Sequence, residues 1–176
     1  QIVNKLEPIL LKESPDGVLV YGDTNSTLAG SLAAEKCKVP IFHVEAGLRS
    51  YNKSMIEEKN RLMTDRISSL LFCPTENAIH NLSKEGITDG VFFTGDVMYD
   101  SFLKYMKKAM DSNYKQKIVN SSYILATIHR KENTDYKEKL SSIFSSLEKI
   151  NNNLSIIMPI HPRTSKKIDD YNIKTN

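Results

Sequence analysis

The sequence predicts an α/β fold built on parallel sheets, and two observations lead to this prediction. Short apolar runs alternate along the chain with longer amphipathic stretches. Each run is too short for a typical helix and is apolar on both faces, as in a strand buried within a parallel sheet. Strand–helix–strand alternation with right-handed crossovers indicates a doubly wound sheet.

The apolar runs predict strands at residues 18–21, 41–44, 70–73, 91–93, 123–126 and 156–158. The amphipathic stretches predict helices near residues 25–36, 56–68, 75–85, 98–111, 135–150 and 164–170. An earlier helix is expected to be under way at Gln1. Turns are indicated at Pro15-Asp16-Gly17, Val39-Pro40 and Pro74, and Gly86 is expected to end a helix.

The alternation breaks once. After Gly95 comes a long polar helical stretch from Tyr99 to about Lys117, then the weakly patterned residues 119–122. A new strand–helix series starts at Tyr123. We therefore expect a domain boundary near residues 97–120.

Composition excludes several classes of protein. The net charge of +3 over 176 residues is spread without a Lys/Arg block, which disfavours a nucleic-acid partner. No run approaches the roughly 18 apolar residues of a membrane span, and no signal-peptide pattern opens the chain. Cys37 and Cys73 lack metal-ligand spacing, so we expect a reducing, cytoplasmic setting.

Polar and charged residues gather directly after the expected strands. They are Gly22-Asp23-Thr24, Glu45 to Arg49, Thr94-Gly95-Asp96, His129-Arg130 and His161-Pro162-Arg163. Ligands of open α/β sheets bind beyond the carboxyl ends of the strands. Five strand ends with such groups predict a functional site there.

The groups after the first two strands also have structural explanations. Asp23, Thr24 or Ser26 could simply cap the next helix. Glu45 follows an apolar strand directly, so its carboxylate must be paired or functional. Arg49 is the structural partner that would explain Glu45 without a site.

The later groups have structural explanations too. Glu57 and Arg61 lie four residues apart on an expected helix, where an exposed ion pair is the default explanation. In residues 129–134 an Asn or Thr would cap the following helix, which leaves His129 unexplained. Residues 161–163 could form an ordinary turn.

Familiar catalytic motifs are missing from these 176 residues. There is no G-x-x-x-x-G-K-[ST], G-x-G-x-x-G, G-x-S-x-G or H-E-x-x-H sequence. Asp23, His43, Glu45 and His129 are conceivable metal ligands. His43 and Glu45 are only two residues apart on one strand and nothing places a third ligand beside them, so no metal is expected.

Five segments, in this order, resemble the bacterial and archaeal non-hydrolysing UDP-N-acetylglucosamine 2-epimerases. They are YGDTNST from Tyr21, HVEAGLRS from His43, EEKNR from Glu57, CPTENA from Cys73 and TIHRKEN from Thr127. HVEAGLRS is the most specific, and Gly95 to Asp100 resembles the segment between the family's two domains. The resemblance runs from about Pro15 to Arg163, and the chain departs from the family at Ile56, where Pro is usual.

The resemblance implies a glycosyltransferase-B type fold of two Rossmann-like domains, both incomplete in this chain. Residues 1–100 would be the second half of the N-terminal domain, 101–120 the interdomain connection, and 121–176 the first part of the C-terminal domain. The family's Gly-Thr-Arg-Pro-Glu loop and its later uridine-binding segment do not occur in these 176 residues.

The resemblance also implies an isomerase of polysaccharide biosynthesis that converts UDP-N-acetylglucosamine to UDP-N-acetylmannosamine through a 2-acetamidoglucal. Asp23, Glu45 and Glu57 match the family's acid/base carboxylates, and His129 matches its diphosphate-side histidine; which carboxylate serves which face stays open. Further candidates for substrate, diphosphate or effector contacts are Arg49, Arg61, Arg130 and His161. The UDP-sugar is the expected partner, no cofactor or metal is required, and the complete enzyme is expected to be a homodimer.

Several alternatives remain at this point. The motifs do not separate UDP-N-acetylglucosamine from another UDP-sugar, such as a UDP-2,3-diacetamido sugar. HVEAGLRS argues against the hydrolysing epimerases, and a glycosyltransferase needs no cluster of three carboxylates. An inactive truncated remnant is the remaining alternative. We expect the three carboxylates to converge on one cleft, with His129 in a different sheet from Asp23.

Overall fold

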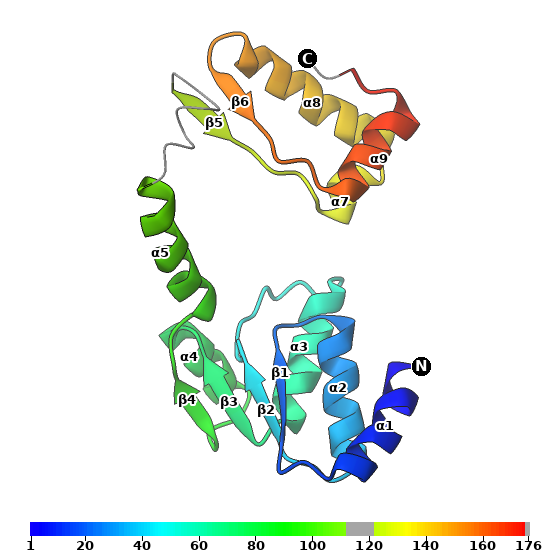
Figure 1. The fold of residues 1–176 in the computed structure, drawn as a ribbon, viewed down its shortest axis with the longest axis vertical. Coiled ribbons are helices and arrows are strands. Elements are labelled where there is room, and N and C mark those ends of the chain that lie inside the picture. Colours follow the sequence, from blue (N-terminus) through cyan, green and yellow to red (C-terminus); the bar gives the residue numbers. More distant parts are fainter. Residues whose placement is uncertain (112–121, 175–176) are drawn as a thin grey trace. The chain divides into compact units, whose positions relative to one another are not determined.

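The computed structural model describes residues 1–111 and 122–174 (Figure 1). The chain divides into two compact units, Gln1–Met106 and Lys107–Asn176, and each is described by itself. Residues 112–121 lie outside the described residues; they include residues 112–120 of the expected connection at 101–120 and residues 119–121 of the weakly patterned stretch. Within the described residues, no helix is both long and apolar enough to cross a membrane.

The first unit alternates helices and strands. Its helices are α1 (Ile2–Glu13), α2 (Asn25–Lys36), α3 (Ile56–Ile67), α4 (Glu76–Lys84) and the start of α5 (Val97–Met110). Its strands are β1 (Val18–Tyr21), β2 (Ile41–Val44), β3 (Leu70–Cys73) and β4 (Val91–Phe93). All four strand predictions are confirmed, and Gly86, at φ 76°, follows the C-cap of α4 as expected.

The four strands form one parallel sheet in the order β1-β2-β3-β4. Each new strand is added on the same side of the strand before it. Because parallel crossovers are right-handed, the helices between these strands fall on one face of the sheet. Two clusters fill the space between that face and its helices. One contains Val20, Ala34 and Ile41, and the other contains Ala46, Leu71, Cys73, Ala78 and Leu82.

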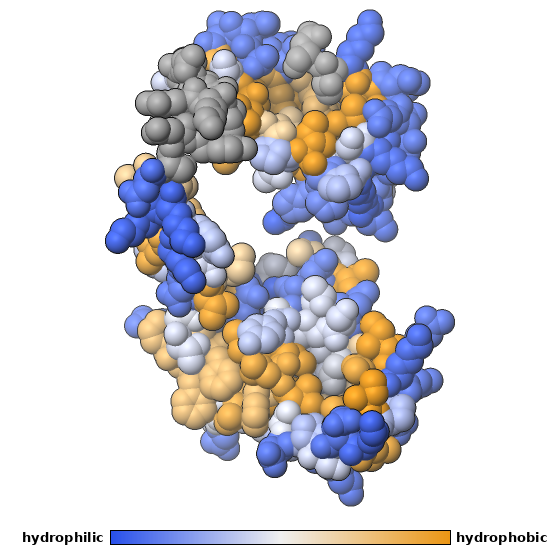
Figure 2. Space-filling view, in the orientation of Figure 1, coloured by the Kyte–Doolittle hydropathy of each residue, from blue (hydrophilic) through white to orange (hydrophobic). Residues whose placement is uncertain are grey.

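The opposite face of this sheet is open in the described residues. Leu19, Tyr21 and Phe92 are 47%, 60% and 50% exposed, and the rings of Phe72 and Phe92 lie 6.1 Å apart. Figure 2 shows apolar side chains gathered over this sheet. The expectation that both faces of each strand are buried is therefore wrong for β1 and β4, because the helices that connect the strands, α2, α3 and α4, lie on the other face.

The second unit has a two-stranded parallel sheet, β5 (Tyr123–Leu125) and β6 (Ser155–Ile157). Its helices are α7 (Lys131–Thr134), α8 (Lys137–Asn151) and α9 (Pro162–Tyr171). Leu140, Phe144 and Ile168 form its core.

One local prediction in this unit is wrong. Neither Asn133 nor Thr134 caps α8, because both belong to the short helix α7, and the N-cap of α8 is Tyr136 without a side-chain hydrogen bond. The hydroxyl of Thr134 instead donates to the carbonyl of Arg130. Both units thus confirm the α/β fold with parallel sheets, and β1 and β5 lie in separate sheets.

Candidate active site

The turn after β1 leaves the Asp23 carboxylate free of a capping role. Thr24 is the N-cap of α2 and accepts from the amide of Thr27 at 3.3 Å. The Thr27 hydroxyl donates to the carbonyl of Tyr21 at 2.6 Å, which ties the helix start to the end of the strand. The Asp23 carboxylate pairs with the guanidinium of Arg61.

Arg61 lies on α3 and connects three segments of the unit. Besides Asp23, it reaches the carbonyl of Leu48 at 3.2 Å and the carboxylate of Glu58 at 3.5 Å. Its side chain is 13% exposed. The expected Glu57–Arg61 pair is not formed within residues 1–111 and 122–174, and Glu57 lies exposed in the first turn of α3.

Glu45 stands where strand β2 ends, in a conformation that is rare for a residue with a side chain. Its φ is 75°, and its amide and that of Ala46 both donate to the carbonyl of Phe72 at 3.1 Å. Two successive amides on one acceptor break the strand's alternation, as a bulge does, and re-aim the side chain. Backbone strain of this kind clusters at functional sites.

The Glu45 carboxylate lies against Gly22. A Cβ at Gly22 would stand 3.3 Å from Glu45 Oε2, and the φ of Gly22 is +65°. Burial raises the pKa of Glu45, the charges of Asp23 and Asp96 raise it further, and Arg61 and His43 oppose them. Among the described residues no hydrogen bond to this carboxylate is formed. Such a carboxyl group is suited to accept and return a proton.

Arg49 does not pair with Glu45, so the structural explanation of Glu45 is wrong. Its guanidinium donates to both carboxylate oxygens of Glu85, at 2.7 and 2.8 Å, and to Asp65 at 2.7 Å. Burial lowers the pKa of Arg49, but Glu85 and Asp65 outweigh that effect and raise it. The side chain is 1% exposed, which does not suit the expected substrate contact.

Asp65 and His43 form a fully buried pair behind the turn. Nδ1 of His43 lies 2.7 Å from Asp65 Oδ1, and Nε2 lies 2.8 Å from the carbonyl of Gly22. The other oxygen of Asp65 accepts the amide of Gly47 at 3.1 Å. The sequence had suggested His43 only as a conceivable metal ligand. In the part of the chain that the structure describes, no three His, Cys, Asp or Glu side chains group to hold a metal.

Two further residues of α3, Glu58 and Asn60, shape the site, although no individual role was predicted for either. Glu58 accepts from the amide and hydroxyl of Ser50 at 2.8 and 2.9 Å and from the amide of Tyr51 at 3.0 Å. Asn60 donates to the carbonyl of Asp23 at 2.9 Å. Both side chains are buried, at 3% and 5% exposure. The sequence signal that could have revealed Glu58 and Asn60 is that the face of α3 directed toward the interior is polar, where an apolar face is usual.

The second unit brings His129 and His161 together. Both are exposed, as is Arg130, and the two ring centroids lie 6.4 Å apart. His161 is the N-cap of α9 and accepts the amide of Arg163 at 3.2 Å. The Thr164 hydroxyl donates to the carbonyl of Ile128 at 2.6 Å, which holds α9 beside the loop after β5.

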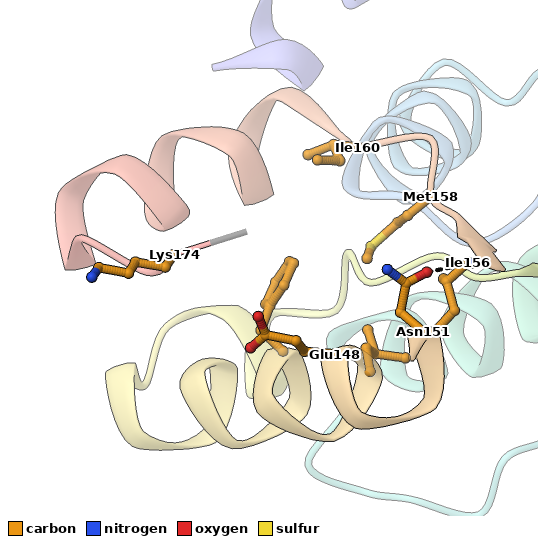
Figure 3. Close-up of a pocket in the computed structure, with 8 residues that line it drawn as sticks. Glu148, Asn151, Ile156, Met158, Ile160 and Lys174 are labelled. Atoms are coloured by element: carbon orange, nitrogen blue, oxygen red, sulfur yellow. Dashed lines mark hydrogen bonds between the residues drawn. The ribbon is translucent and has the colours of Figure 1, made fainter. Parts of the chain in front are cut away.

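A pocket of about 250 Å³ opens elsewhere in the second unit (Figure 3). It is lined both by apolar side chains, among them Ile156, Met158 and Ile160, and by the polar side chains of Glu148, Asn151 and Lys174. The side chain of Asn151 accepts the amide of Ile156 at 2.9 Å. None of the site residues predicted from the sequence lines this pocket.

Comparison with known proteins gives a consistent result. The family described as UDP-N-acetylglucosamine 2-epimerase matches residues 1–176. A UDP-N-acetylglucosamine 2-epimerase homolog of Methanococcus maripaludis is 52% identical over 98% of this chain and 49% of its own length. A UDP-2,3-diacetamido-2,3-dideoxy-D-glucuronate 2-epimerase of Pseudomonas aeruginosa is 47% identical over 99% of this chain and 50% of its length.

Solved structures agree. The Methanocaldococcus jannaschii UDP-GlcNAc 2-epimerase in complex with UDP-GlcNAc and UDP superposes with a TM-score of 0.88 at 44% identity, over 98% of this chain and 49% of that one. The Neisseria meningitidis enzyme bound to UDP-GlcNAc gives 0.82 at 36% identity, over 97% and 50%. The chain thus spans about half the length of the relatives that it matches.

Proposed function

The chain belongs to the UDP-N-acetylglucosamine 2-epimerase family, and we propose that the protein containing it inverts C2 of a UDP-N-acetylhexosamine. UDP-N-acetylglucosamine would become UDP-N-acetylmannosamine. Residues 1–100 would be the second half of an N-terminal Rossmann-like domain, 101–120 the interdomain connection, and 121–176 the first part of a C-terminal Rossmann-like domain. In the same proposal, the protein that contains this chain is a homodimer located in the cytoplasm.

The observation that carries the proposal is the contrast between two neighbouring carboxylates. Asp23 is paired with Arg61, whereas Glu45 is partly buried, accepts no hydrogen bond within the described residues and has a raised pKa. Two neighbouring carboxyl groups with such different surroundings are suited to different steps of a proton transfer.

The reaction needs such groups because no carbonyl is attached to C2 to acidify its hydrogen. A base takes the C2 proton while the C1–O bond breaks, and the bonding pair leaves with UDP. This elimination gives the intermediate 2-acetamidoglucal, which has a C1=C2 double bond. UDP then adds back to C1 while a protonated group delivers a proton to the opposite face of C2. Nothing is oxidised or reduced overall.

Asp23, Glu45 and Glu57 are proposed for these proton transfers, and His129 for the departing diphosphate. Glu57 lies exposed and forms no ion pair in the described residues, so its carboxylate is available to a ligand. Arg61 acts through Asp23 in this scheme. Arg130 and His161 lie beside His129 in chain or in space and are proposed as further diphosphate or effector contacts. Arg49 is left out of this set because of its burial.

Incubation of the native-length protein with UDP-N-acetylglucosamine in deuterated water tests the proposal. Epimerisation by this route places deuterium at C2, which mass spectrometry detects, and NMR identifies the product as UDP-N-acetylmannosamine. Product without deuterium at C2 would exclude proton exchange at that carbon. Absence of product with every UDP-sugar offered would contradict the activity itself.

A second substrate is favoured by one specific relative. The Pseudomonas aeruginosa protein, 47% identical, is an epimerase of UDP-2,3-diacetamido-2,3-dideoxy-D-glucuronate. The same proton transfer at C2 would serve that sugar, which differs at C3 and C6. Comparing kcat/KM for the two UDP-sugars decides between them.

A further inference from the structure

His43 is enclosed by groups that accept hydrogen bonds. The ring is 0% exposed, with the Asp65 carboxylate 2.7 Å from Nδ1 and the Gly22 carbonyl 2.8 Å from Nε2. A neutral imidazole carries one N–H and one lone pair. With Asp65 ionised, the lone pair of either tautomer would face an oxygen that can only accept.

Two arrangements relieve this conflict: a proton on each ring nitrogen, or a protonated Asp65. The second oxygen of Asp65 receives the amide of Gly47 at 3.1 Å and the guanidinium of Arg49 at 2.7 Å. Donors of this kind stabilise a carboxylate rather than a carboxylic acid. The contacts therefore favour an imidazolium ring at His43.

The other charged and titratable groups around the ring are consistent with a charged His43. Arg49 and Glu85 lie behind Asp65, so a charged His43 would give this network two positive and two negative groups. Glu45 directly follows the strand that carries His43. The buried thiol of Cys73, on β3, has a pKa raised to about 11 by burial and stays neutral.

The second N–H of His43 acts on the turn that carries Asp23. Gly22 has left the strand, at φ +65°, although its amide still donates to the carbonyl of Val44 at 3.1 Å. Its carbonyl accepts from His43, the next carbonyl, of Asp23, accepts from Asn60 at 2.9 Å, and the Asp23 carboxylate pairs with Arg61. Three separate donors thus set the orientation of Asp23.

We propose that His43, held as an imidazolium between Asp65 and Gly22, is a positioning residue that orients Asp23 for proton transfer. This inference rests on the proposed function for its kinetic consequence, but the charge of the ring and the geometry of the turn do not. His43 touches no substrate in this scheme, because its ring is fully enclosed.

The charge is tested by long-range proton–nitrogen NMR of the native-length protein with ¹⁵N-labelled histidine, at about pH 8, where an ordinary histidine is mostly neutral. We expect both ring nitrogens of His43 to carry protons, with the signals assigned by their loss in His43→Gln. Exposed His80, replaced in His80→Gln, is the matched control. A lone pair on either nitrogen of His43 overturns the proposal.

Positioning is tested by comparing His43→Gln with His80→Gln. We expect kcat per folded molecule to fall about 10- to 100-fold in His43→Gln with KM within about twofold, because a displaced catalytic group costs turnover more than binding. The ¹³C signal of the Asp23 carboxyl group should also move, and this readout needs no activity. An unchanged kcat together with an unmoved Asp23 signal would leave His43 a purely structural residue.

If His43→Gln does not fold, Asn60→Ser should displace the same Asp23 signal, and the nitrogen spectrum of the unmodified protein decides the charge of the His43 ring. Lack of turnover in the unmodified protein contradicts the proposed function and leaves both NMR results interpretable.

Discussion

Arg61 of α3 pairs with Asp23 of the β1–α2 turn, which lies 38 positions earlier in the chain. The same guanidinium contacts the carbonyl of Leu48 and the carboxylate of Glu58. One side chain therefore joins the turns after two strands to the helix that follows the second. The pair places a cation beside Asp23 and close enough to Glu45 to lower its pKa against the effect of burial.

Replacing Arg61 by Gln should lower both stability and activity. The pair is neither fully buried nor fully exposed, so we expect a loss of about 1–3 kcal/mol in the free energy of unfolding, between the values for surface and buried pairs. We expect kcat to fall about 100-fold because Asp23 loses its partner.

Chemical denaturation and initial rates of the native-length protein measure the two effects. Arg163→Gln is the matched control, because Arg163 pairs with Asp135 at an exposed position of the second unit. Little change in denaturation is expected for it. Equal losses in the two variants would argue against a special role for the Arg61–Asp23 pair.

The strands were predictable because their signal is local. A run such as Val18 to Tyr21 shows its strand character in four residues, and the structure begins and ends β1 to β4 at the predicted positions. Thr24 could be named in advance as one of three cap candidates for α2 for the same reason. The burial of the two sheet faces could not be predicted in this way, since it depends on which strands are neighbours and on which side each crossover passes.

The site was predictable only in part, because burial of a polar residue is a long-range property. Glu58 and Glu57 are adjacent in sequence, yet the rotation of α3 buries Glu58 against Ser50 and Tyr51 and leaves Glu57 exposed. In the sequence His43 looks like an ordinary strand residue. The register of β2 pairs it with Val20 and Leu71, on the face of the sheet that the helices cover. Asp65 lies near the end of α3, where nothing local indicates its contacts with Arg49 and His43.

The free energy of unfolding of Glu45→Gln, relative to that of the unmodified protein, should be higher at neutral pH than at acidic pH. The pKa of Glu45 in the folded protein is raised above its usual value of 4.5 by burial and by Asp23. Its contribution to stability is therefore full below about pH 4.5 and is lost as the pH rises through the folded pKa. Removing the carboxylate relieves the folded protein only at higher pH.

Unfolding free energies of Glu45→Gln and the unmodified protein, compared at pH values on either side of 4.5, measure this difference. Glu35→Gln, an exposed change on α2, serves as the control. A relative stability of Glu45→Gln that falls with rising pH would contradict the raised pKa.

Glu58→Gln should show the opposite pH dependence. Burial pushes the pKa of Glu58 upward, but the donors of Ser50 and Tyr51, with Arg61, outweigh it and lower the pKa below 4.5. Its stabilising contribution is present above about pH 4.5 and is lost as the pH falls through the folded pKa. We expect a loss of about 1–3 kcal/mol near neutral pH, because hydrogen bonds to a charged acceptor are removed.

The same denaturation series, extended to acidic pH, tests this prediction. The difference between Glu58→Gln and the unmodified protein should shrink as the pH falls. A constant difference across the series would mean that the ionised state of Glu58 contributes nothing. Glu57→Gln, one residue earlier and exposed, is the matched control for stability.

Substitution of the proposed catalytic groups should lower turnover while the fold is kept. We expect Asp23→Asn, Glu45→Gln and Glu57→Gln each to reduce kcat by about 10²- to 10⁴-fold, the range typical of proton-transfer groups. His129→Asn should be impaired as well, through weaker stabilisation of the departing diphosphate. Circular dichroism reports the fold, and His80→Asn provides the control at an exposed helix position. Full activity of any one variant removes that residue from the mechanism.

Residues 1–176 expressed by themselves should not epimerise UDP-N-acetylglucosamine. They correspond to about half the length of the relatives, and binding energy from parts of a substrate remote from C2 is what positions the reacting carbon. The open face of the β1–β4 sheet, with Leu19, Tyr21 and Phe92 exposed, should also make the isolated segment prone to associate.

The test compares this segment with the native-length protein in three measurements: formation of UDP-N-acetylmannosamine, binding of a dye specific for exposed apolar surface, and size by light scattering. We expect turnover only in the native-length protein, with dye binding and association in the segment. Comparable turnover by both would show that the groups gripping the substrate lie within these 176 residues.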